Sequence, residues 1–248
     1  MERDVFDELF DEIYLTTYSP RLGEVDSAAE AEAAVQLAGV EPPVEILDAP
    51  GGFGRHSIPL AEAGYRVTSI DRSAVQLEEG RRRAGEAEWP RFVQADIREL
   101  PFDDESFDAV LCLFSSIGYR GEEGDRQTFA EFLRVLRRGA AVIIETMHRD
   151  RLMWIFQARR WEPLKDDAVL IEEGRFDHVA GEIETDHILA PADGPRRSVT
   201  YRMRCYTATE LVRMLAAAGF GEIEAFGDYE GGELKRESRL VVRALKPA

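Results

Sequence analysis

The residues best placed to do chemistry surround a glycine-rich turn between two acids. Asp48 lies near the end of the apolar run VEILDA, Gly51, Gly52 and Gly54 follow it, and Asp71 ends the next apolar run, YRVTSID. Glycines at such a turn let the backbone approach a ligand closely, and the helix that follows directs free N–H groups towards it. A carboxylate at the end of the second run is positioned to accept both hydroxyls of a ribose. These features predict a nucleoside-binding site.

The same turn also bears on which nucleoside cofactor binds. A dinucleotide fingerprint counted from Gly52 requires glycine at position 57, where the chain has Ser57. Asp48 places negative charge where a pyrophosphate would be repelled. A cofactor with positive charge suits this position better, and the sulfonium and amino-acid portion of S-adenosylmethionine supply that charge.

The stretch from about Val44 to Asp150 resembles the class I S-adenosylmethionine-dependent methyltransferases. The family pattern, an acid followed by x-G-x-G-x-G, occurs here as Asp48, Pro50, Gly52 and Gly54, so proline replaces the first glycine and Gly51 is expected to supply the turn. The runs GRHSIPLAEAGYRVTSIDRS, QADIRELPF and FDAVLCLFSSIGY resemble a subgroup that acts on small molecules, and RCYTATELVRMLAAAGF extends the family resemblance over most of the chain. The resemblance implies S-adenosylmethionine as cofactor and does not identify the acceptor.

The resemblance assigns roles to individual positions of this chain. It implies that Asp71 binds the ribose, Asp96 accepts from the adenine amino group and Ile97 packs on the adenine ring, with Arg72 stacking on or flanking the base. Leu113 would line the methionine side of the pocket. The alternative for Asp48, Asp71 and Asp96 is that each only caps a helix or a loop. The predicted cofactor-binding residues are Asp48, Gly51, Gly52, Gly54, Asp71, Arg72, Asp96, Ile97, Leu113 and Tyr18.

Methyl transfer by in-line displacement chiefly requires alignment of the reacting atoms, and we expect no metal site. A base would help a protonated amine or a hydroxyl acceptor, and His148, after the fifth predicted strand, is the candidate; the alternative is a loop histidine bonded to backbone. Tyr119 is expected to face the acceptor. Tyr14 and Tyr18 could cover the cofactor, although core packing explains Tyr14 equally well. The remaining histidines are expected to be structural or at the surface, with His56 fixing the glycine loop.

The elements that must position these residues follow a βα alternation. VEILDA, YRVTSID, RFVQADI, FDAVLCLF and AAVIIET are the predicted strands, and their continuous apolar character suits a sheet covered on both faces. Ser73 with Gln76 and Thr207 with Glu210 predict helix starts, and Gly139 is expected to end the helix between them. We therefore expect an α/β fold, a doubly wound, seven-stranded Rossmann-like methyltransferase sheet with its last strand antiparallel.

A segment with a different periodicity interrupts the repeat. VLIEEGRFD, GEIETDHIL and RRSVTYRMRCY predict three antiparallel strands that form a small β insertion, or lid, over the active site. The expected organisation is an N-terminal helical flank over residues 1–40, the cofactor-binding core over 41–150, the lid over 151–206, and the rest of the core sheet over 207–248.

Composition limits the partners. The net charge of −17 disfavours nucleic acid and anionic lipid, so a small-molecule acceptor is expected. Two cysteines and an acidic N-terminus without a signal-peptide pattern predict a cytoplasmic protein that does not associate with membranes, and homo-oligomerisation stays open. The function expected is methyl transfer from S-adenosylmethionine to N or O of a small molecule. The alternatives are a methyltransferase acting on protein or RNA and a non-catalytic S-adenosylmethionine-binding protein.

Overall fold

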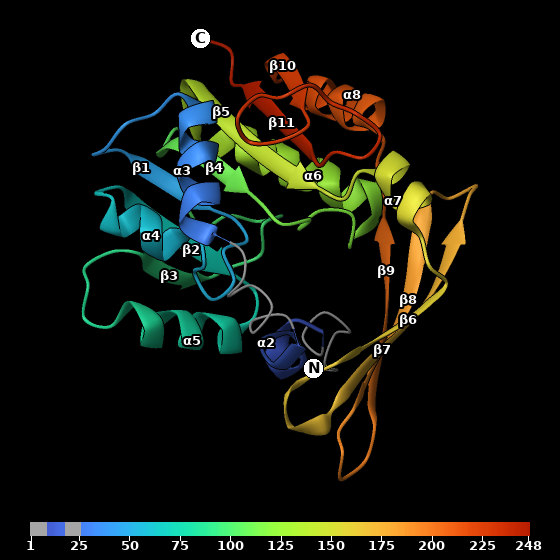
Figure 1. Ribbon diagram of the computed structural model, residues 1–248. Helices are drawn as coiled ribbons and strands as arrows, with labels where there is room; N and C mark the ends of the chain where they lie inside the picture. The colour runs from blue at the N-terminus through green and yellow to red at the C-terminus, as the bar shows by residue number, and fades with distance from the viewer. Residues whose placement is uncertain (1–8, 18–25) are drawn as a thin grey trace.

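The computed structural model describes residues 9–17 and 26–248 and contains two β-sheets (Figure 1). The larger has seven strands in the order β10-β11-β5-β4-β1-β2-β3. Its strands are β1 (Glu45–Asp48), β2 (Arg66–Asp71), β3 (Arg91–Gln94), β4 (Phe107–Cys112), β5 (Leu136–Thr146), β10 (Gly221–Phe226) and β11 (Leu240–Leu245). Strands β1 to β5 pair in parallel, whereas β11 is antiparallel to both β5 and β10. The predicted doubly wound sheet with an antiparallel last strand is confirmed.

Helices cover both faces of this sheet (Figure 1). On one face α3 (Ser27–Ala38) and α4 (Ser57–Glu62) pack through Ala34, Val35 and Leu60. On the other, α6 (Gly121–Val135) and α8 (Ala208–Ala218) pack through residues such as Phe129 and Leu215, both fully buried. Helix α5 (Ala74–Ala84) lies against β2 and β3. Each strand of the sheet centre is thus apolar on both sides, as its sequence indicates.

Local signals set most helix ends. Ser73 caps α5 by accepting from the backbone of Gln76, Thr207 and Glu210 form a complete capping box on α8, and Gly219 ends α8 in a left-handed conformation. The expected end of α6 at Gly139 is wrong. Helix α6 ends at Val135, because Leu136 already joins β5 in pairing with Phe107, and Gly139 lies inside that strand with φ of 76°.

The second sheet has four strands in the order β6-β7-β8-β9, one more than the three expected. They are β6 (Arg159–Pro163), β7 (Val169–Asp177), β8 (Glu182–Ala190) and β9 (Arg197–Arg204). The sequence does not predict β6, because this edge strand, RRWEP, has only exposed residues and therefore no alternation of buried and exposed positions. Figure 1 shows this lid standing beside the core sheet, joined to β5 by α7 (Arg149–Ile155).

The lid leaves and rejoins the core at one place. The backbone N–H of Arg149, where the excursion begins, donates to the carbonyl of Tyr206, where it ends, at 3.1 Å. Beside this junction, Arg204 N donates to Gly118 O at 2.8 Å. Gly118 has φ of 95°, and a Cβ there would lie 2.2 Å from Arg204 O, so only glycine lets the two segments approach.

The N-terminal segment crosses from the core to the lid. It comprises the short π-helix η1 (Leu9–Ile13) and α2 (Tyr14–Thr17). Leu9 and Ile13 pack on Val199 of the lid, while the Phe10 carbonyl accepts from Gln76 Nε2 of α5 at 2.7 Å. In the part of the chain that the structure describes, no helix has the length and hydropathy needed to cross a membrane.

Candidate functional site

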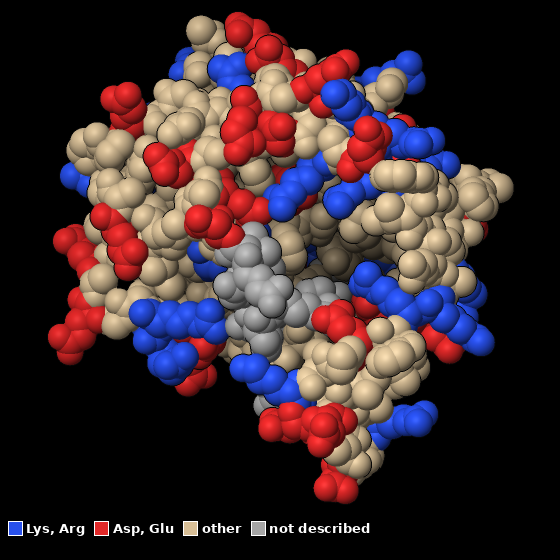
Figure 2. Space-filling view, in the orientation of Figure 1, with Lys and Arg blue, Asp and Glu red and all other residues tan. Residues whose placement is uncertain are grey.

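A cavity of about 580 Å³ lies between the carboxyl ends of the core strands, the lid and the N-terminal segment. Its wall runs from the glycine loop and Asp71, past Leu113, to Met147, Tyr201 and Thr185. Figure 2 shows the hollow beside the grey atoms. Ligands of doubly wound sheets bind at this edge, which makes the cavity the candidate active site.

The glycine loop is tightly packed against the strand that follows it. A Cβ on Gly51 would lie 2.2 Å from Ser69 Oγ and 2.9 Å from Asp48 Oδ2, so the backbone occupies the space of a side chain. Gly52 lines the cavity with φ of 55°, and Gly54, with φ of 80°, packs instead against Phe92. Gly51 and Gly52 therefore face the ligand space, while Gly54 shapes the turn.

Asp48 lies beneath this loop and not in the described cavity wall. Its Oδ2 accepts from Ser57 Oγ at 2.5 Å, and its Oδ1 is buried without a hydrogen-bond partner in the described chain. Burial raises the pKa of the Asp48 carboxyl to about 7, against the opposing effects of the Ser57 hydrogen bond and Arg55. A buried carboxylate with an unused oxygen favours a cationic ligand above it.

Asp71 is held by backbone N–H groups at the end of β2. Its Oδ2 accepts from Gly52 N at 3.1 Å and its Oδ1 from Ser73 N at 2.8 Å. Burial raises its pKa to about 6, because these hydrogen bonds offset only part of the desolvation. The carboxylate thereby ties the glycine loop to α5 and lines the cavity with acceptor capacity left for ribose hydroxyls.

Asp96 and its neighbours form the far end of the cavity. Arg98 donates to both Asp96 oxygens, at 3.0 and 2.7 Å, and Arg72 Nε lies 3.6 Å from Oδ2. Burial opposes ionisation of Asp96, but the Arg98 hydrogen bonds outweigh it and lower the pKa. Arg72 thus pairs with Asp96, an ion pair that the sequence did not predict. Ile97 lines the wall beside them.

The end of β4 has an unusual backbone. After Leu113, which is buried in the cavity wall, Phe114 and Ser115 have φ of 63° and 56°. Glu145 at the end of β5 holds them: its Oε2 accepts from Phe114 N at 2.8 Å and its carbonyl from Ser115 N at 3.0 Å. Non-glycine residues in this region are strained, and such strain concentrates at functional sites. Burial raises the pKa of Glu145, a cavity-lining acid that sequence analysis missed.

A second missed group links α3 to the glycine loop. Glu30 accepts from Arg55 at 2.8 Å and from Arg239 at 2.6 Å, and its carboxylate lies 3.4 Å from His56 Nε2. Burial opposes ionisation of Glu30, but the hydrogen bonds from His56 and Arg55 lower its pKa to about 2. Burial lowers the pKa of His56 to about 4, so it is neutral and fits the expected role of fixing the loop. No sequence motif predicts the contact of Arg239 with Glu30, because the two residues are 209 positions apart in the chain.

The N-terminal segment supplies Leu9, Phe10 and Tyr14 to the wall. Burial raises the pKa of Tyr14 to about 12, and its hydroxyl interacts electrostatically with Arg55 and Asp71. Tyr14 therefore lines the part of the cavity that contains the predicted donor site. Tyr18, the other tyrosine proposed as a cover, lies outside the described residues.

Tyr119 lies in the wall on the lid side. Its ring makes an edge contact with Phe10, with centroids 5.3 Å apart, and a tilted contact with Tyr201 of β9 at 5.8 Å. Core, N-terminal segment and lid therefore meet at Tyr119, and the role expected for it at the acceptor stays a prediction.

His148 does not fit the role of base. Among the described residues it is absent from the cavity wall; it caps the start of α7, its imidazole is buried, and Nε2 lies 3.6 Å from Asp150 Oδ2. Glu145 and Met147, at and just after the end of β5, line the cavity instead. The prediction that His148 is the base is therefore wrong. His187, expected to be structural or at the surface, is fully buried in the lid beside Glu172.

The residues present fit a nucleoside cofactor with a cationic end. A backbone cradle at Gly51 and Gly52, an acceptor at Asp71 and an unused buried oxygen on Asp48 are what such a group requires. Within residues 9–17 and 26–248, no cluster of three or more His, Cys, Asp or Glu could hold a metal ion.

Comparison with known proteins agrees with this geometry. A family model described as a methyltransferase domain matches residues 46–139. A demethylmenaquinone methyltransferase of Clavibacter sepedonicus is 43% identical over 99 residues, 40% of this chain and 39% of that protein. A glycine/sarcosine N-methyltransferase of Aphanothece halophytica is 29% identical over 210 residues, 82% of this chain and 76% of that protein. This chain therefore spans about two fifths of the first relative and three quarters of the second.

The fold is also similar to solved structures. The CcbJ methyltransferase from Streptomyces caelestis superposes with a TM-score of 0.78 at 22% identity, over 95% of this chain and 98% of that one. The similarity extends beyond residues 46–139 and therefore includes the part of the chain that carries the lid.

Proposed function

The chain belongs to the class I S-adenosylmethionine-dependent methyltransferases, and from this premise we propose that it transfers the methyl group of S-adenosylmethionine to N or O of a small molecule. The observation that carries the proposal is one continuous cavity that contains both the glycine loop with Asp71 and a separate wall made by Tyr119, Met147 and the lid. Donor and acceptor can thus meet in a single cavity.

In the donor half, the glycine loop and Asp71 would hold the ribose, and Asp96 with Ile97 would hold the adenine. Asp96 keeps acceptor capacity despite its two bonds to Arg98, because a carboxylate offers about four lone-pair sites. Arg72 flanks the base through its pairing with Asp96. When bound, S-adenosylmethionine supplies an electrophilic methyl group on a positively charged sulfur. Asp48, beneath the loop, and Leu113, in the wall, are the residues for its amino-acid end.

In the acceptor half, this chain's contribution is alignment and exclusion of water. Phe10, Tyr119 and Tyr201 form an aromatic contact that closes the cavity between the core and the lid. Good alignment of reacting atoms lowers a barrier by roughly 7 to 11 kcal/mol. Tyr119 is the residue that we propose to contact the acceptor, and no described histidine other than His56 lies in the wall.

The relatives favour nitrogen as the methylated atom. The match to the Clavibacter relative covers only 40% of this chain and 39% of that protein, so its name carries no weight for the acceptor. The Aphanothece relative matches through the lid region over 82% of this chain, and its name specifies N-methylation. The acidic surface, with a net charge of −17, further supports a small acceptor over RNA.

The experiment has two steps. Calorimetry with S-adenosylhomocysteine tests the donor site, and Asp71→Ala is expected to lower affinity at least a hundredfold, with Asp103→Ala on the exposed loop as the control. Uptake of labelled methyl from S-adenosylmethionine into a panel of amines, phenols and carboxylates then tests transfer. Undiminished affinity of Asp71→Ala for S-adenosylhomocysteine would refute the donor site. Tight binding of S-adenosylhomocysteine without methyl uptake by any class of acceptor would instead indicate a non-catalytic binding protein.

A further inference from the structure

The cavity has a charge balance opposite to that of the chain. The sequence has 31 Lys and Arg against 48 Asp and Glu, yet the described cavity wall contains seven arginines and five carboxylates. Figure 2 shows Lys and Arg side chains on the upper and lower rims of the hollow. An acidic protein that concentrates guanidinium groups around one cavity attracts anions to that cavity.

Most of these arginines form ion pairs with carboxylates of the protein itself. Arg55 and Arg239 bond to Glu30, Arg72 and Arg98 to Asp96, and Arg160 to Glu172. Arg120 starts α6 and has contacts of its own. These guanidinium groups are largely neutralised within the protein.

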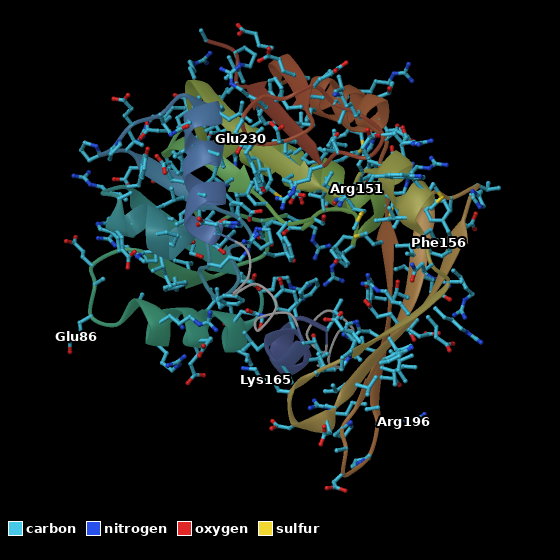
Figure 3. All side chains as sticks on the ribbon, in the orientation of Figure 1. Glu86, Arg151, Phe156, Lys165, Arg196 and Glu230 are labelled. Carbon is cyan, nitrogen blue, oxygen red and sulfur yellow. The ribbon has the colours of Figure 1, made fainter. Side chains whose placement is uncertain are left out.

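Arg151 differs from the others. It is half-buried in the cavity wall on α7, and within the described residues it makes no hydrogen bond and no ion pair. Its electrostatic neighbour is His148, whose pKa is lowered by burial and also by Arg151. Figure 3 labels Arg151 and Phe156 on the segment between the core sheet and the lid. This segment leads from β5 to the lid and also brings Gln157 and Arg160 to the wall, whereas the glycine loop and Asp71 follow β1 and β2 on the other side of β4. An unpaired guanidinium thus faces the acceptor half.

We propose that Arg151 binds an anionic group of the acceptor, a carboxylate or a phosphate ester, and that the methyl acceptors of this protein are small anionic molecules. The proposal rests on the proposed function, because it assigns the acceptor half of the same cavity. A planar guanidinium binds either anion through two parallel hydrogen bonds, and this would fix which acceptor atom points towards Leu113. Arg151 would then act in positioning and in specificity.

The test uses the full chain loaded with S-adenosylhomocysteine and titrated by calorimetry with acetate and, separately, with pyrophosphate. At least one of the two anions is expected to bind, and the one that binds more tightly indicates whether the acceptor carries a carboxylate or a phosphate. Arg151→Gln should weaken that binding at least tenfold, and Arg151→Lys should weaken it less. Arg159→Gln is the matched control, since Arg159 is 80% exposed, pairs with Glu173 and is not in the described wall.

Failure to bind either anion, or equal binding by Arg151→Gln, overturns the proposal. The affinity for S-adenosylhomocysteine should be the same in all four proteins, because Arg151 lies away from the donor residues. If the wild-type chain itself binds no S-adenosylhomocysteine, the proposed function fails instead, so the two failures are distinguishable. Raising the salt concentration should weaken anion binding in the wild-type chain more than in Arg151→Gln.

Discussion

The Tyr206 hydroxyl donates to Asp125 Oδ2 at 2.6 Å, joining the end of the lid to helix α6 across 81 residues of sequence. Both side chains are buried, and Asp125 also accepts from Gly118 N at 3.0 Å. Burial raises the pKa of Asp125 to about 6, against the effect of the Tyr206 hydrogen bond. One carboxylate therefore holds the turn after β4 and the base of the lid together.

Removing this hydroxyl should loosen the lid. Tyr206→Phe leaves Oδ2 of the buried Asp125 with the Gly118 N–H as its remaining donor, and we expect the free energy of unfolding to fall by about 1 to 3 kcal/mol. Denaturant unfolding measures the change. Tyr229→Phe is the comparison, because the buried Tyr229 hydroxyl has no hydrogen-bond partner within the described residues. An equal loss in both variants would argue against a special role for the Tyr206 contact.

The glycine loop should not tolerate a methyl group. In Gly51→Ala the new Cβ would lie 2.2 Å from Ser69 Oγ and 2.9 Å from Asp48 Oδ2, so the loop must move away from the donor site. Affinity for S-adenosylhomocysteine should drop at least a hundredfold while the circular dichroism spectrum stays native. Gly221→Ala, whose Cβ meets nothing nearer than 3.9 Å, should bind normally. Normal binding by Gly51→Ala would remove the loop from the site.

The ionised Asp48 carboxylate should lower the free energy of unfolding although it favours binding of the cofactor. Its pKa rises from 3.8 to about 7 on folding, so between these values the folded chain holds a proton that the unfolded chain has lost, and the contribution of Asp48 to stability falls as pH rises. Asp48→Asn should therefore raise the free energy of unfolding at pH 8, by roughly 1 to 3 kcal/mol, and much less at pH 4. Thermal unfolding at both pH values measures this difference.

The same protonation should affect binding in the opposite direction. Below about pH 7 the Asp48 carboxyl becomes neutral, and the affinity of the wild-type chain for cationic S-adenosylmethionine should decline as pH falls. Asp48→Asn should show weak affinity at every pH. A wild-type affinity that is flat from pH 8 to pH 5 would contradict this role.

The N-terminal segment should control release of the cofactor product. Gln76→Ala removes the donor to the Phe10 carbonyl and should speed dissociation of S-adenosylhomocysteine several-fold, measured by stopped flow. Gln36→Ala, which removes an exposed contact with Glu32, is the matched control. Identical dissociation rates in the two variants would show that the segment does not cover the site.

The sequence predicted the core sheet well because each buried strand is a short apolar run between glycine or polar turns. It also placed Asp71, Leu113 and Tyr119 in the cavity wall, since the carboxyl ends of parallel strands meet at one edge. Strand β6 was missed because an exposed edge strand has no apolar periodicity. Sequence position suggested His148, but helix α7 buries its ring behind the wall.

The residues that the sequence did not reveal act through tertiary contacts. Glu30, Arg55 and Arg239 come from three distant segments and meet only after folding. Glu145 lies in the run AAVIIET, where its acid resembles an ordinary strand end, yet it holds the left-handed backbone of Phe114. Charge alone could not single out Arg151 either, since its distinguishing feature is that it forms no ion pair within the described residues.

The hydrogen bond between Arg149 and Tyr206 has a consequence for how such enzymes diversify. Because the lid starts and finishes a single hydrogen bond apart, a segment of another length can replace it without moving the strands of the core sheet, provided that it keeps the contacts at Gly118 and Val199. A chimera carrying a foreign segment at this junction would keep its methyl donor and acquire a new acceptor.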